Sequence, residues 1–420
     1  MQQKRIVRPS RVRVAERNYT LIVMAKTKAQ SRSSGKQKKQ QVEMTAEQLY
    51  NLAHEALETS QPDVALSYAQ DLLDLVNPGL STSSSMIEAT PLPPALPALT
   101  LLGEISVELG DILRAQVYFQ LAIKLDPEGH VPDELGGGAE KFLWLAQLSD
   151  EGGADSVKWF EKGVASLKFH IDLLEKTTMD AESKEAMVDE KGSQIANALC
   201  SVVEVYMTDL SWEADAETRC DNLITEALLF APENPEVLQT LASVRLSQLK
   251  HEDARSALSR SMALWKDADP QDDIVPDYPT RISLARLLME AEMEDEAMVV
   301  LERLALEDDQ SVEACYLGGW CLHLLAEKRK KAQEAGATAN GDEEDPIETS
   351  KASRKWLLNT RKLYNIQDYE DSRLGKHTEE LIEELDKILG PPPSDGEADE
   401  EYDEWEDEEF SEDEEMAGME

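Results

Sequence analysis

The chain has 420 residues, of which 85 are acidic and 42 basic, and its formal net charge is -43. A charge of this size excludes ordinary electrostatic binding of nucleic acid by the body of the protein and favours a strongly basic partner. No apolar run approaches the roughly 20 residues of a membrane span, and no segment has the layout of a signal peptide. Four cysteines are too few for a disulfide framework, so we expect reduced thiols, no membrane contact, and a cytoplasmic and nuclear location.

A basic leader, which we place at residues 1–44, precedes the first helical pattern. Residues 1–41 carry twelve Lys or Arg against one acid, and this composition predicts disorder. Met24 begins a sequence typical of a natural start, and the interpretation of residues 1–23 as an upstream gene-model extension stays open. The basic cluster within the leader is either a nuclear localisation signal or only a solubilising tail. Its members are Lys36, Lys38 and Lys39.

The first helix pair is predicted at residues 46–76. Ala65 stands twelve residues after Ala53, so that two small side chains fall where paired helices touch. Asn77-Pro78-Gly79 stops the second helix. The Ser/Pro-rich stretch over residues 79–97 is expected to be a loop.

The clearest pattern spans residues 99–127 and predicts two short helices joined by a turn. Gly103 has no side chain, and Ala115 follows twelve residues later at the facing position. Phe119 lies one turn beyond Ala115, where it can fill the groove between the helices, and Pro127 ends the second helix. These offsets match the tetratricopeptide repeat, a helix–turn–helix unit of about 34 residues. Since one unit cannot bury its own apolar face, we expect others.

Five more helix pairs are predicted after Pro127. The third and fourth are carried mainly by helical periodicity, and residues 170–191 between them are expected to extend one helix and then form a loop. The fifth and sixth repeat the twelve-residue spacing, at Ala242 and Ala254 and again at Ala285 and Ala297. In the seventh, the second helix is expected at residues 353–364, after a charged insertion over residues 327–350 that should be flexible.

A last amphipathic pattern, at residues 374–389, is suited to cover an open end of the array. The predicted fold is therefore all-α: a tetratricopeptide-repeat superhelical solenoid of about seven helix pairs over residues 45–390, with a C-terminal capping helix and disordered termini. An unrelated helical bundle is the alternative.

The C-terminal tail is strongly acidic. Residues 394–420 contain sixteen Asp or Glu and no Lys or Arg, so the tail should stay unfolded. Aromatic residues interleave with the acids and can add apolar contact to charge attraction; the alternative is a tail that serves solubility alone. The tail residues assigned to partner binding are Glu400, Glu401, Tyr402, Asp403, Glu404, Trp405 and Phe410.

Motifs of catalysis are missing from the sequence. The six histidines form no HExxH or paired-ligand spacing, and there is no GxxxxGK[ST] phosphate loop, GxSxG elbow or GxGxxG following a strand. The sequence therefore predicts neither an enzyme nor a bound metal or cofactor.

In a tetratricopeptide array the first helix of each pair lines the concave groove, and the exposed face of that helix selects the ligand. The projected residues are mostly acidic and lack the several Lys/Arg positions that bind the acidic tails of heat-shock chaperones. Such a groove should hold a basic, extended peptide, although any single glutamate can be only a solvent-facing charge. The projected residues are Tyr50, His54, Glu58, Glu104, Glu108, Asp150, Glu151, Glu204, Arg286, Met289 and Glu290.

The layout of the chain resembles one known family. The MAKTK…KQKK leader at residues 24–39, the repeats that start with AEQLYNLAHEALE at residues 46–58, and the tail EEYDEWEDEEFSEDEEM at residues 400–416 are similar to the fungal dedicated assembly chaperones of large-subunit ribosomal protein four (uL-four). The resemblance implies that the superhelix holds an internal basic loop of its client and accompanies it into the nucleus for assembly into pre-ribosomes. It also implies that Glu104, Glu108 and their neighbours are groove residues.

The function predicted is therefore that of a dedicated chaperone in ribosome biogenesis, which escorts a newly made basic ribosomal protein to the nucleus for large-subunit assembly. A nuclear import receptor is a second expected partner, and the chain should be monomeric apart from its client. A histone chaperone, or a scaffold subunit of a stable nuclear complex, is the alternative.

Overall fold

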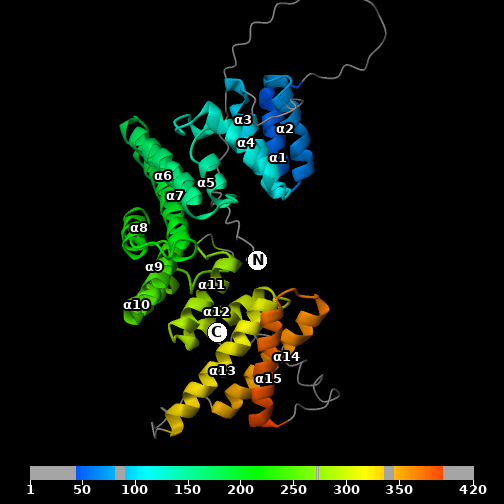
Figure 1. The fold of residues 1–420 in the computed structure, drawn as a ribbon, viewed down its shortest axis with the longest axis vertical. Coiled ribbons are helices and arrows are strands. Elements are labelled where there is room, and N and C mark those ends of the chain that lie inside the picture. The colour runs from blue at the N-terminus through cyan, green and yellow to red at the C-terminus, as the bar shows by residue number, and fades with distance from the viewer. Residues whose placement is uncertain (1–43, 81–89, 271, 273, 335–344, 391–420) are drawn as a thin grey trace, which may run out of the picture. The chain divides into compact units, whose positions relative to one another are not determined.

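The computed structural model describes residues 44–80, 90–270, 272, 274–334 and 345–390. These residues form fifteen α-helices and two short 3₁₀ helices, with no strand among them (Figure 1). The predicted basic leader, except Met44, and the predicted acidic tail lie outside the described residues. The helices are α1 (Ala46–Glu58), α2 (Pro62–Val76), η2 (Pro93–Ala95), α3 (Leu96–Glu108), α4 (Ile112–Leu125), η3 (Asp133–Leu135), α5 (Glu140–Gln147), α6 (Gly153–Lys176), α7 (Ala181–Met207), α8 (Ala216–Phe230), α9 (Pro235–Ser247), α10 (His251–Ala263), α11 (Tyr278–Glu290), α12 (Glu294–Glu307), α13 (Val312–Glu334), α14 (Pro346–Ile366) and α15 (Ser372–Leu389).

The predicted fold class is confirmed: every described element is a helix, and most of the helices pack on the next helix along the chain. The chain divides into two compact units. The first runs to Gln248 and includes residues 260–264, and the second comprises residues 249–259 and those from Trp265 onward. In the first unit α1 packs on α2, α3 on α4, α5 on α6 and α7 on α8; in the second, α11 packs on α12 and α13 on α14. The last helix, α15, packs on both α13 and α14.

Several helices begin at a side chain that caps them. Thr45 and Gln48 form a reciprocal capping box at the start of α1, which satisfies two backbone N–H groups that the helix itself leaves unpaired. Asn234 and Asp277 accept backbone N–H groups at the starts of α9 and α11, and a proline follows each of them in the first turn. Proline is tolerated there because its missing N–H would be unpaired anyway.

Small residues lie at the helix contacts, as the repeat spacing predicts. A Cβ atom added to Gly103 would lie 2.5 Å from the ring of Phe119, so the ring occupies the space that the glycine leaves. Ala115 and Phe119 are both fully buried, and the Phe119 ring stacks on Trp144 of the next pair with 6.4 Å between centroids. In the second unit, Gly319 gives the same access to Leu357 of α14.

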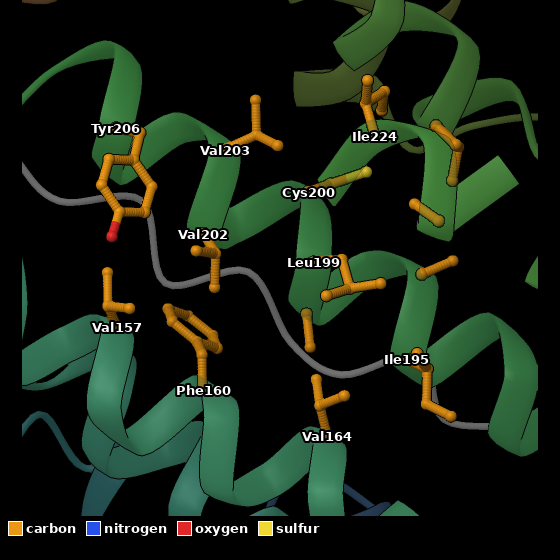
Figure 2. Packing of buried hydrophobic residues seen from close by; sticks show 14 of the residues in the cluster. Val157, Phe160, Val164, Ile195, Leu199, Cys200, Val202, Val203, Tyr206 and Ile224 are labelled. Atoms are coloured by element: carbon orange, nitrogen blue, oxygen red, sulfur yellow. The ribbon is translucent and has the colours of Figure 1, made fainter. Parts of the chain in front are cut away.

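Figure 2 shows in close-up a hydrophobic core in the middle of the first unit. Val157, Phe160 and Val164 project from α6 toward the side chains of α7. Ile195 on α7 and Ile224 on α8 are fully buried in the same cluster. Burial of this kind contributes about 25 cal/mol per Å² of apolar surface removed from water, so the helix pairs are held mainly by their shared apolar faces.

Two predicted loops are partly helical. Residues 181–191, expected in a loop, form the first turns of α7, which begins after its cap Asp180. Most of the expected flexible insertion is also helical, because α13 continues to Glu334 and α14 begins at Pro346; residues 335–344 lie outside the described residues. Over residues 181–191, 327–334 and 346–350 the expectation was wrong, because Ala, Glu, Lys and Met favour helix even where the apolar stripe is weak.

A closed loop joins α4 to α5 and is built around one buried ion pair. Lys141 has no exposed surface, and its Nζ donates to the Asp126 carboxylate at 2.8 Å and to the Gly138 carbonyl at 2.6 Å. Asp126 also accepts the backbone N–H of His130 at 2.9 Å. Burial lowers the pKa of Lys141, and the hydrogen bond and charge of Asp126 oppose that shift. The loop is therefore fixed by a charge pair that water does not reach.

Candidate partner-binding surface

The first helix of the array presents three predicted residues along one face. The rings of Tyr50 and His54 stack with 6.2 Å between centroids, and His54 Nδ1 lies 3.4 Å from the Glu58 carboxylate. Each of the three is one turn from the next, because residues four apart share a helix face. Tyr50 is half-buried, whereas His54 and Glu58 are exposed. The structure thus brings these three side chains together as predicted; their contact with a partner stays a prediction.

The two glutamates of α3 form most of its accessible face. Ten of the thirteen side chains of α3 are buried, and the three that keep access to solvent are Pro97, Glu104 and Glu108. Glu104 follows Gly103 directly, so the helix turns its small residue toward Phe119 and its carboxylates away from that contact. Helix α3 also contacts α1. The first helices of the first two pairs therefore adjoin, and both carry acidic residues.

In the third pair, Asp150 and Glu151 lie in the turn between the helices. Helix α5 ends at Gln147, so these two projected groove residues belong to the connection to α6 and not to a helix face. Gly152 and Gly153 have positive φ angles, 60° and 45°, so the chain turns here instead of continuing the helix. Asp150 accepts a hydrogen bond from the Gln116 side chain at 3.3 Å. Glu204, by contrast, is exposed on α7 as predicted.

The second unit contains a cavity of about 640 Å³ between α11, α13 and α15. We call it the aromatic cavity. Three of the predicted residues line it, and the others come from α13 and from the start of α15. The lining residues are Arg286, Met289, Glu290, Tyr316, Leu317, Trp320, Leu324, Asp371, Arg373, Leu374 and His377.

Aromatic rings form one wall of this cavity. Trp320 lies edge-on to His377 with 5.2 Å between centroids and tilted toward Tyr316 at 5.9 Å. The Tyr316 hydroxyl and His377 Nδ1 are 2.7 Å apart, which ties α13 to α15. Burial raises the pKa of Tyr316; the charge of Arg286 opposes this shift and that of Asp371 adds to it. The phenol therefore stays protonated at neutral pH.

The aromatic residues of this cavity were not predicted as partner-binding residues, although one signal was available. Gly319 is a small residue of α13 that faces the partner helix, against Leu357. Tyr316 lies three residues before Gly319 and Trp320 directly after it. Tyr50 and His54 have the same positions relative to Ala53 in α1, on the accessible face of that first helix. His377 had no such signal, because α15 was interpreted only as a cap.

A smaller cavity of about 220 Å³ lies between α14 and α15. Its charged lining residues are Arg361, Lys376 and Glu379, and Arg361 lies 3.5 Å from the Glu379 carboxylate. The first turns of α15 therefore separate two cavities, and the linings of both together contain four basic and three acidic residues. This is an unusual balance for a chain with 85 acidic and 42 basic residues.

All four cysteines are buried free thiols. Burial raises the pKa of Cys200 and Cys321 from 9.0 to about 12 and that of Cys315 to about 11, and it also raises the pKa of Cys220. The nucleophilic form of a thiol is the thiolate. These thiols are therefore poor nucleophiles, as expected of reduced core residues.

We predict that iodoacetamide at pH 8 labels none of the four thiols rapidly in the native chain. For Cys200 and Cys321, a pKa of about 12 in place of 9.0 cuts the thiolate fraction about a thousandfold, so native labelling of these two thiols should be at least about a hundredfold slower than labelling in concentrated urea. Mass spectrometry of time points reads each site separately. Rapid labelling of any cysteine in the native chain would contradict the packing around it.

The described residues were compared with the requirements of a membrane span and of a metal site. None of their helices combines the length and the apolar character needed to cross a membrane. Within the same residues, no three His, Cys, Asp or Glu side chains are grouped so that they could hold a metal ion. The tail residues from Glu400 to Phe410 lie outside the described residues.

The chain is similar to two curated proteins and to solved structures, one of which is reported below. No protein-family model matches the chain. A protein of Emericella nidulans named "Probable assembly chaperone of rpl4" is 49% identical over 371 residues, which cover 86% of this chain and 88% of the relative. A Schizosaccharomyces pombe protein of the same name is 36% identical over 310 residues, covering 74% of this chain and 85% of the relative.

The solved structure titled "Assembly Chaperone of RpL4 (Acl4) (Residues 1-338)" is 47% identical and superposes with a TM-score of 0.63. The match covers 69% of this chain and all of that one. The names of all three proteins describe chaperones, and none describes an enzyme. Identity at this level over most of both chains confirms the resemblance on which the sequence analysis relied, and the chain belongs to the family of fungal assembly chaperones of the ribosomal protein rpl4.

Proposed function

We propose that this chain binds newly made ribosomal protein RpL4 and holds a basic extension of it on acidic first-helix faces until the client is assembled into the large subunit. The observation that carries the proposal is the identity of 49% with a relative named for RpL4 assembly, over 86% of this chain. The net charge of -43 supports a basic client, because opposite potentials speed encounter and reject acidic competitors.

Affinity purification of the tagged full chain from native lysate tests the client. RpL4 recovered in amounts comparable with the chain supports the proposal. Recovery of heat-shock chaperones without any ribosomal protein would overturn it, and stoichiometric histones would establish the alternative of a histone chaperone.

The acidic face of α3 gives a sharper prediction. The double variant Glu104→Lys with Glu108→Lys should weaken RpL4 binding at least about tenfold, because it reverses two charges where basic client residues are expected. Binding is measured by calorimetry with purified client. The matched control is Asp71→Lys with Asp74→Lys, two exposed acids on the second helix of the first pair, which makes the same change in net charge. Equal effects of the two double variants would show that α3 does not contact the client.

We also propose that the basic leader directs nuclear entry through an import receptor. Replacing Lys36, Lys38 and Lys39 with alanine in the fluorescently tagged full chain should shift it from nucleus to cytoplasm. Replacing three other basic residues of the leader, Lys26, Lys28 and Arg32, controls for the loss of three charges. Nuclear levels that are unchanged by the first triple variant would exclude that cluster as the signal.

A further inference from the structure

The aromatic cavity has a lining that suits an acidic peptide with an aromatic side chain. Trp320, Tyr316 and His377 offer ring edges and faces, and Met289 offers a thioether; both kinds of group contact an inserted aromatic ring favourably. At the rim, the guanidinium of Arg373 has no ion-pair partner among the described residues. An arginine side chain without an ion-pair partner can bind a carboxylate through two parallel hydrogen bonds.

The charges around the cavity leave one basic residue for an acidic occupant. Two arginines and two acids line the cavity. Arg286 is paired with Glu313, and at the neighbouring cavity Arg361 is paired with Glu379 and Lys376 with Glu380. Among the described lining residues, Arg373 is therefore the basic group to which a carboxylate of an acidic segment can bind.

The chain itself contains such a segment close by. Residues 400–410 read EEYDEWEDEEF, three aromatic residues among eight carboxylates, and Trp405 follows Gly390, the last described residue, by fifteen positions. From Gly390 back to His377 along α15 is thirteen residues, about 20 Å at the rise of an α-helix. At the roughly 3.1 Å per residue of an extended Pro-rich chain, fifteen residues can reach about 45 Å. The tether is therefore long enough to span this distance, and a tether that spans its site raises the effective concentration of the segment.

We propose that the acidic aromatic segment at residues 400–410 docks on the aromatic cavity when no client is bound. Trp405 inserts against Met289 and Trp320, and neighbouring carboxylates pair with Arg373. The inference goes beyond the proposed function and does not depend on it, because it concerns the chain without a client. Its consequence is that any ligand that uses this cavity must first displace the tail.

A photo-crosslink in the full chain tests the docking. Trp405 is replaced by p-benzoylphenylalanine, which keeps an aromatic group and reacts readily with methionine. Irradiation followed by mass spectrometry should place most crosslinks on α11 near Met289 and on α13 near Trp320 and Leu324. Crosslinks spread over the chain, or concentrated on another surface, would overturn the proposal.

Matched variants exclude a charge effect alone. Arg373→Glu should reduce the crosslink yield at Met289 at least about fivefold, whereas Lys387→Glu, an exposed basic residue near the other end of the same helix, should change it less than twofold. Circular dichroism checks that both variants remain folded. Equal yields in the two variants would overturn the proposal. Mixing isotope-labelled with unlabelled chain shows whether the crosslink joins two copies, and crosslinks mainly between copies would overturn it as well.

Discussion

Replacing Lys141 with methionine is expected to destabilise the first unit by about 3 to 5 kcal/mol, the usual cost of removing one partner of a buried ion pair. The variant leaves the Asp126 carboxylate charged and 4% exposed, without the ammonium group that lies 2.8 Å from it in the native chain. It also removes the donor to the Gly138 carbonyl. Hydrogen–deuterium exchange of α5 and α6 peptides in the full chain measures the loss as faster opening of these helices.

Two variants give this prediction its controls. Lys351 pairs with Glu348 at the same 2.8 Å, but both side chains are more than half exposed, so Lys351→Met should cost less than about 1 kcal/mol. Adding Asp126→Asn to Lys141→Met removes the unpaired charge and should recover part of the stability. If Lys141→Met costs no more than Lys351→Met, the buried pair does not stabilise the loop.

Phe119→Ala is expected to cost about 3 to 5 kcal/mol, as is usual for a large aromatic side chain in a packed core. The ring is fully buried between Gly103 and Trp144 and joins the second helix pair to the third. Urea unfolding of the full chain, together with hydrogen exchange of α3 and α4 peptides, measures the loss.

The effect of Gly103→Ala on the free energy of unfolding should change sign when Phe119 is replaced with alanine. Gly103→Ala alone is expected to destabilise by about 1 to 3 kcal/mol, because the added Cβ meets a ring that cannot shift without moving Trp144. In the Phe119→Ala background the same change should stabilise by up to about 1 kcal/mol, since alanine favours helix over glycine. Gly192→Ala is the control, because its nearest neighbour would lie at an ordinary 3.5 Å. The absence of coupling between residues 103 and 119 would contradict the contact.

Helix contacts could be predicted from the sequence because they depend on offsets within one pair. Two examples are Gly103 with Phe119 and Ala285 with Ala297. Each pair faces across a helix–turn–helix unit only if the turn has the standard length, and both alanines are fully buried, as this spacing requires. The limits of α7, α13 and α14 could not be predicted in the same way. Their polar extensions follow helix propensity rather than an apolar stripe.

The candidate site was predicted less completely than the fold. Arg286, Met289 and Glu290 were identified because they project from one helix face, and all three line the aromatic cavity. His377 was missed because it reaches the cavity from another helix, 61 residues after Tyr316, a proximity that local spacing does not reveal. Lys141 was missed for a related reason, since a lysine is normally assigned to the surface and its partner, fifteen residues away, becomes visible only once the loop is folded.

The burial of all four native thiols makes the chain a convenient subject for distance measurements. A cysteine introduced at an exposed described position, such as Ala214, would be the fast-reacting thiol and would accept a spin label or fluorophore while Cys200, Cys220, Cys315 and Cys321 are left in place. Pairs of such labels, one in each unit, would measure the distance between the two units with and without added RpL4, without first engineering a cysteine-free background.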